Sequence, residues 1–177
     1  MVVVGFFVLL AVGIFTLAGI CLGQQNKQSN QDFLRLHIRA NSNDPADQSV
    51  KHLVRQGIVD ELTPLFYDVV SKKDAMLRLR DNLEFIEGIA NTVLYTNGFS
   101  YTAKAGIKSE HFPTRSYTTT EFSLALPEGI YDALILQLGE GTGDNWWCVI
   151  YPPLCFMENS VDSIRYQFKL LEWFKKQ

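Results

Sequence analysis

The sequence predicts a single α+β domain in which a helical hairpin packs on a largely antiparallel sheet. Its elements are expected in the order β-α-α-β-β-β-β, followed by a C-terminal helix. Three observations predict this class. A strand-like segment comes first, two long stretches with apolar residues at helical spacing follow, and further strand-like segments lie between residues 101 and 151. Successive strands joined by short turns favour antiparallel pairing, with the helices against one face of the sheet.

The first strand is expected at about residues 33–40. Alternate side chains of a strand point to opposite faces of the sheet. The apolar set, expected in the core, is Leu34, Leu36 and Ile38. The polar set, expected on a solvated face, is Arg35, His37 and Arg39.

A helix start follows within residues 41–47. Asp44 can accept hydrogen bonds from the first free backbone N–H groups, and Pro45 suits the first helical position because it has no N–H. Apolar residues then recur at helical spacing over several turns. Pro64 predicts a kink or a split in this helix, with Thr63 as a second cap.

A second helix is expected to begin at Ser71, because Ser71 and Asp74 have the spacing of a capping box. It would end at Asn97-Gly98, since glycine tolerates the left-handed conformation common at helix ends. A short join between the two helices predicts a hairpin.

Period-two alternation predicts strands at 101–107 and 122–126. Largely apolar segments predict two more at 131–138 and at 146–151, the last stopped by Pro152-Pro153. The Gly-rich segment 139–145 is interpreted as a hairpin connection, because it leads into a strand and offers no helix N-terminus to a phosphate. Residues 158–177 predict an amphipathic C-terminal helix, which would dock on the domain or contact a partner or membrane surface.

The N-terminal residues 1–23 predict a signal peptide or an N-terminal membrane anchor. Val2 to Leu22 carry no charge, and in a helix they would be about 30 Å long, close to the hydrocarbon thickness of a bilayer. The stretch has no basic start, so cleavage and anchoring both remain open. Residues 24–32 form a polar linker before the folded part.

Composition argues against several classes of function. The net charge is −3 without a cluster of Lys and Arg, so we expect no nucleic-acid partner. The three histidines, His37, His52 and His111, match no known catalytic or zinc motif, and we expect no catalytic residue, metal, cofactor or small-molecule substrate.

Cys148 and Cys155 are candidates for a disulfide if the domain is exported. Two free buried thiols are the alternative. Trp146 and Trp147 are adjacent within a predicted strand, so one should enter the core and the other should face a different cover or a partner.

Several blocks of the sequence resemble the stage II sporulation protein R family over about residues 34–157. They are Arg35 to Gln48, Phe112-Pro113-Thr114 with Tyr117, Leu126 to Leu134, Gly139-Glu140-Gly141, Asn145 to Cys148, and Pro152 to Phe156. We therefore assign residues 33–157 to a domain of this kind.

The resemblance implies a sporulation signal without catalysis of its own. Such a protein would be made in the forespore and exported into the space between forespore and mother cell. Its partner there would be a membrane-bound aspartic peptidase of the mother cell, which trims the precursor of sigma-E.

The candidate contact residues for this partner are His37, Arg39, Asn41, Ser42, Asp44, Tyr117 and Trp147. Two alternatives stay open for them: the polar residues after the strand would only cap the helix, and His37 and Arg39 would only line a solvated face. Two other functions also stay open. One is an envelope or peptidoglycan-binding module that uses Trp147, and the other is a membrane-anchored enzyme that acts through Cys148 or His37.

Overall fold

The computed structural model describes residues 30–118 and 123–152 of the 177-residue chain. Its elements are η1 (Asn30–Asp32), β1 (Leu34–Arg39), α2 (Pro45–Leu65), α3 (Lys72–Asp81), α4 (Leu83–Thr96), β2 (Ala103–Phe112), β3 (Arg115–Thr118), β4 (Ser123–Leu126), β5 (Gly129–Leu138) and β6 (Asn145–Tyr151). In this described part, no helix has the length and apolar character needed to cross a bilayer. The predicted segments 1–23 and 158–177 lie outside the described residues, as does the linker except for η1 at its end.

The α+β class is confirmed. Four strands form one sheet in the order β2-β5-β1-β6, and β3 and β4 form a separate two-stranded sheet. Only the pairing of β1 with β5 is parallel, while β1 with β6, β2 with β5 and β3 with β4 are antiparallel. The first strand of the chain therefore lies inside the sheet, between two strands that come much later.

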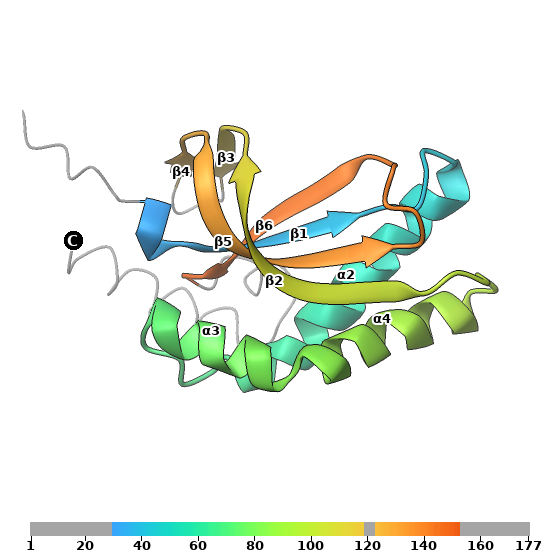
Figure 1. The fold of residues 1–177 in the computed structure, drawn as a ribbon, viewed down its shortest axis with the longest axis horizontal. Coiled ribbons are helices and arrows are strands. Elements are labelled where there is room, and N and C mark those ends of the chain that lie inside the picture. The colour runs from blue at the N-terminus through green and yellow to red at the C-terminus, as the bar shows by residue number, and fades with distance from the viewer. Residues whose placement is uncertain (1–29, 119–122, 153–177) are drawn as a thin grey trace, which may run out of the picture. The chain divides into compact units, whose positions relative to one another are not determined.

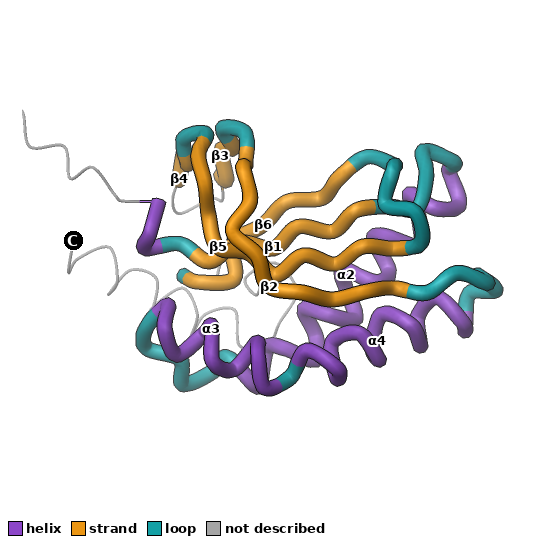
Figure 2. The backbone as a smooth tube through the Cα atoms, viewed as in Figure 1, coloured by secondary structure: helices purple, strands orange, loops and turns teal. Residues whose placement is uncertain are grey.

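The three helices lie against one face of the four-stranded sheet (Figures 1 and 2). The fully buried core between them comes from alternate strand residues and from one face of each helix. It includes Leu34, Leu36, Ile38, Leu134, Leu136, Val54, Ile58, Leu79, Ile86 and Ala90. The predicted inward set of β1 is thus confirmed, because burial of apolar surface fixes the register of a strand.

The helices differ from the prediction in where they break. Pro64 lies inside α2 near its end, and the Thr63 hydroxyl donates to Val59 O within the same helix instead of capping a new one. The second predicted helix is divided at Asn82 into α3 and α4. The Asn82 side chain donates to Arg78 O, a local bond through which asparagine competes with the helical backbone.

Two predicted helix ends are confirmed. Ser71 caps α3 by accepting a hydrogen bond from Asp74 N at 3.0 Å. Gly98 follows α4 with a φ of 82°, the left-handed conformation that favours glycine.

The strands are longer and more numerous than the alternation predicts. β2 continues to Phe112, and β5 begins at Gly129. The short strand β3, residues 115–118, was not predicted because its largely polar and exposed sequence shows no apolar alternation. Segment 139–145 does not close a hairpin, since β1 separates β5 from β6 in the sheet.

Candidate interaction site

Most of the candidate contact residues lie on one side of the sheet, the face turned away from α2, α3 and α4, which we call the outer face. Arg35, His37 and Arg39 of β1 alternate with the core residues of that strand and therefore point to the outer face. Trp147 of β6 pairs with His37 and lies on the same side. The prediction that these side chains are solvated is wrong for two of them, because Arg35 is 0% and His37 is 2% exposed.

Arg35 is enclosed by aromatic rings. Its guanidinium carbon lies 4.5 Å from the ring centroid of Phe112, 5.0 Å from that of Tyr131 and 5.7 Å from that of Tyr117. Nε donates to Cys148 O, and Nη2 donates to the Tyr117 hydroxyl at 2.6 Å. Nη1 is buried without a hydrogen-bond partner among the described residues.

Three π faces thus take the place of a carboxylate around the Arg35 charge in the described part of the chain. Burial lowers the pKa of Arg35, against the opposing influence of Tyr117 and Tyr131. An arginine nevertheless stays protonated at physiological pH. Burial also raises the pKa of Tyr117, although the neighbouring Arg35 lowers it. Tyr117, from the unpredicted strand β3, therefore acts as a neutral hydroxyl that covers a buried cation.

His37 stacks on Trp147, with ring centroids 3.8 Å apart, and Phe112 meets the Trp147 ring edge-on at 4.8 Å. His37 Nδ1 lies 3.2 Å from Glu110 Oε2, so a proton on Nδ1 makes the ring the donor. Arg39 Nη2 donates to the other carboxylate oxygen of Glu110. Glu110 of β2 therefore joins two candidate residues of β1 across β5.

The His37 ring is held neutral at physiological pH. Burial lowers its pKa below the ordinary value, and the charge of Arg39 lowers it further, while Asn145 and Glu110 raise it. His37 Nε2 is buried and has no hydrogen bond of ordinary geometry to a described residue. The nearby Asn145 side chain still raises the pKa of the ring, but less than burial lowers it. The side chain therefore supports Trp147 rather than presenting a polar group at the surface.

The other candidates, Asn41, Ser42 and Asp44, lie in the loop after β1, where their polar groups bond to the chain itself. Asn41 Nδ2 and Ser42 Oγ donate to Asp47 Oδ2 at 2.8 and 2.6 Å, and the Tyr101 hydroxyl donates to Asp47 Oδ1 at 2.6 Å. Burial alone would raise the pKa of Asp47, but these three bonds together hold it below its ordinary value. Asp47, which was not a candidate, is the centre of this network.

Asp44 is the N-cap residue of α2, but its side chain makes no capping bond. Its backbone N–H donates to Ser42 Oγ instead. The predicted role of the Asp44 carboxylate as a helix cap is therefore wrong, because it accepts from none of the first N–H groups of α2. The Asp44 side chain remains exposed at the start of the helix.

The Gly-rich loop wraps around the end of β1 through Asn41. Glu140 N donates to Asn41 Oδ1, Thr142 N and Oγ1 donate to Asn41 O, and Gly143 N donates to Ala40 O. A Cβ on Gly143 would lie 2.1 Å from the backbone oxygen of Ser42, so only glycine fits this approach. The loop and the segment after β1 therefore form one structural unit.

Cys148 is buried and takes part in a disulfide bond. Cys155 lies outside the described residues, so its pairing with Cys148 stays a prediction. Trp146 and Trp147 point to opposite faces, as expected: the guanidinium of Arg55, on α2, lies 5.1 Å from the Trp146 ring centroid, while Trp147 lies on the outer face.

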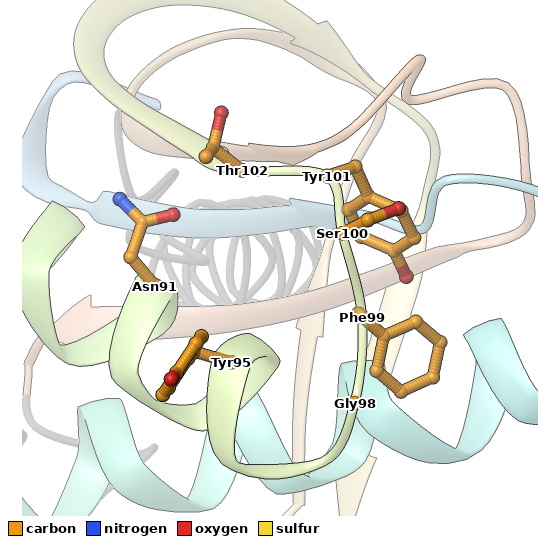
Figure 3. A pocket seen from close by; sticks show the side chains of 7 residues that line it. All are labelled: Asn91, Tyr95, Gly98, Phe99, Ser100, Tyr101 and Thr102. Carbon is orange, nitrogen blue, oxygen red and sulfur yellow. The ribbon is translucent and has the colours of Figure 1, made fainter.

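A cavity of about 540 Å³ lies where α4 meets the start of β2 (Figure 3). Two of its polar side chains already serve the fold, since Asn91 Oδ1 accepts from Ala103 N and the Tyr101 hydroxyl donates to Asp47. No group of three or more His, Cys, Asp or Glu side chains that could hold a metal occurs within residues 30–118 and 123–152.

The chain matches known proteins over most of its length. Residues 30–161 match the family model described as Stage II sporulation protein R. The chain is 35% identical over 127 residues to "Stage II sporulation protein R" of Bacillus subtilis (strain 168), a match that covers 72% of this chain and 55% of the relative. The chain thus spans about half the length of that relative, and no solved structure matches it. The chain belongs to the stage II sporulation protein R family.

Proposed function

We propose that this protein is an exported sporulation signal that activates a membrane-bound aspartic peptidase of the mother cell, which then trims the sigma-E precursor. The observation that carries the proposal is the family match over residues 30–161, which includes all described strands and helices. The proposed place of action is the space between forespore and mother cell, reached through export directed by the N-terminal segment.

The outer face is the proposed contact surface for the peptidase. Trp147 is half-buried there, and the guanidinium of Arg115 lies 5.8 Å from its ring centroid. Arg39, whose side chain is 31% exposed, shares Glu110 with the His37 ring that stacks on Trp147. An aromatic side chain bordered by arginines is the composition that protein-binding hot spots favour. His37 and Tyr117 support this surface from beneath, whereas Asn41 and Ser42 hold the loop beside it.

Co-expression in a non-sporulating host tests the function. The protein, the peptidase and the sigma-E precursor are produced together, and precursor length is followed on a gel. We expect shortening that depends on this protein and decreases with Arg39→Glu. Lys73→Glu is the matched control, because Lys73 is an exposed residue of α3 on the other side of the sheet. No shortening with an exported, folded protein and a competent peptidase would contradict the proposal.

A further inference from the structure

The strand β2 has an edge that is only partly closed. It lies at the end of the sheet, with β5 as its neighbour (Figures 1 and 2). The backbone N–H groups of Ala103 and Ala105 point away from β5 and donate to Asn91 Oδ1 and Glu87 Oε2 of α4, at 2.7 and 2.9 Å. Side chains of α4 therefore satisfy the first part of this edge.

The remaining part of the edge carries backbone donors that no residue of the described ranges binds. The β2–β5 ladder runs without a register shift from Ala103 to Phe112, so every second N–H points outward. By this alternation the N–H groups of Ile107, Ser109 and His111 face the same way as that of Ala105. None of the three has a partner among the described residues. Such an edge is a template for one more strand.

A basic groove borders this open edge on the outer face. We define it by Arg39, Lys104, Lys108 and Glu110, which line a cavity of about 480 Å³. A Cβ on Gly106, in the same cavity, would meet no atom within 4 Å, so the groove is open at this point.

The charges of the basic groove do not balance. Glu110, its one carboxylate, is already bound by Arg39 and by His37. Lys104 and Lys108 are exposed and form no ion pair with a described residue. As far as the described residues show, two cations are therefore available beside backbone groups without a partner.

We propose that one extended, acidic segment of the peptidase binds here as an added strand beside β2, an inference that rests on the proposed function. Its backbone carbonyl groups would accept from Ile107, Ser109 and His111. Its carboxylates, on alternate residues about 7 Å apart, would face Lys108 and the groove.

Other occupants fit these observations less well. A second copy of β2 would bring lysines of two grooves together while Glu110 stays bound to Arg39 and His37. An anionic membrane surface would attract Lys104 and Lys108 but would leave the backbone donors unpaired. An acidic strand satisfies both the backbone and the side chains.

Amide hydrogen exchange followed by NMR tests the proposal on the full-length protein in neutral detergent micelles. The probe is a peptide of about eight residues that alternates Glu and Thr, and the control peptide alternates Lys and Thr. We expect the acidic peptide to slow exchange at Ile107, Ser109 and His111 by about tenfold or more. Lys108→Glu should weaken this binding by about fivefold or more, while Lys73→Glu should leave it unchanged.

Four outcomes would overturn the inference. The first two are an acidic peptide that does not slow amide exchange at these residues, and a Lys peptide that slows it equally. The third is amide exchange that slows as protein concentration rises without any peptide. The fourth is binding to phosphatidylglycerol vesicles that Lys108→Glu abolishes, with no slowing of amide exchange. The last two would assign the edge to a second copy and the groove to a membrane.

The co-expression assay separates this inference from the proposed function. Less precursor shortening with Lys108→Glu than with Lys73→Glu supports the edge as the contact. Equal shortening by both variants refutes the edge contact and leaves the signalling function standing. A wild-type protein that gives no shortening contradicts the function itself.

Discussion

Replacing Asp47 with asparagine should destabilise the fold by about 2–3 kcal/mol, although the side chain keeps its shape. Asp47 is 6% exposed, and its carboxylate accepts from Asn41, Ser42 and Tyr101. Bonds to a charged acceptor are roughly twice as strong as neutral ones, so two bonds kept by the amide oxygen would each lose about 0.7 kcal/mol. The bond at the position of the amide NH2, which cannot accept, would be lost at about 1 kcal/mol. Loss of negative charge in the first turn of α2 adds about 0.5 kcal/mol.

Urea unfolding followed by tryptophan fluorescence measures this difference. Asp44→Asn is the matched control: its exposed side chain makes no capping bond, so its effect should stay below about 0.5 kcal/mol. The folded state lowers the pKa of Asp47 below its value of about 4 in the unfolded chain. The stability that the charged carboxylate contributes is therefore complete above about pH 4 and is lost as the pH falls through the lower pKa of the folded state. The gap between wild type and Asp47→Asn should therefore be constant from about pH 5 to 8 and shrink below about pH 4. Equal losses of stability in the two variants, or a stability difference between wild type and Asp47→Asn that does not change with pH, would refute this reasoning.

Three further predictions concern the outer face, the Gly-rich loop and the cysteines. Tyr117→Phe should cost about 1–3 kcal/mol in urea unfolding, because a buried guanidinium loses its acceptor, and an unchanged midpoint would contradict this. In thermal melts, Gly143→Ala should destabilise the fold by about 2 kcal/mol or more, since the added Cβ would overlap a backbone oxygen, whereas Gly106→Ala should be tolerated. Equal melting temperatures of these two variants would contradict this prediction. Peptide mapping by mass spectrometry should find Cys148 linked to Cys155, and maleimide labelling of Cys148 without reductant would exclude that disulfide.

Local features of the fold could be predicted from the sequence because short-range physics determines them. The alternation of Leu34, Leu36 and Ile38, the capping by Ser71 and the left-handed Gly98 each depend on a few neighbouring residues. The placement of β1 between β5 and β6 could not be predicted, since pairing depends on contacts across about a hundred residues. For the same reason the Gly-rich loop was mistaken for a hairpin.

The candidate site was predicted in part. Sequence reasoning selected His37, Arg39, Tyr117 and Trp147, and the structure brings these four together on the outer face. It missed Arg35, although the alternation placed it on the same face. Its burial comes from Phe112, Tyr117 and Tyr131, which are distant in the chain, so no local pattern signals it. Partner contact by any candidate residue stays a prediction.

Reconstitution from purified components tests the central claim most directly. The peptidase is placed in liposomes with the sigma-E precursor, this protein is added on the extracytoplasmic side, and the rate of precursor shortening is measured. The account predicts a rate that rises with protein concentration, saturates, and persists when the protein's thiols are blocked beforehand without reductant. A rate that does not change when folded protein is added would contradict the claim that this protein is a signal acting directly on the peptidase.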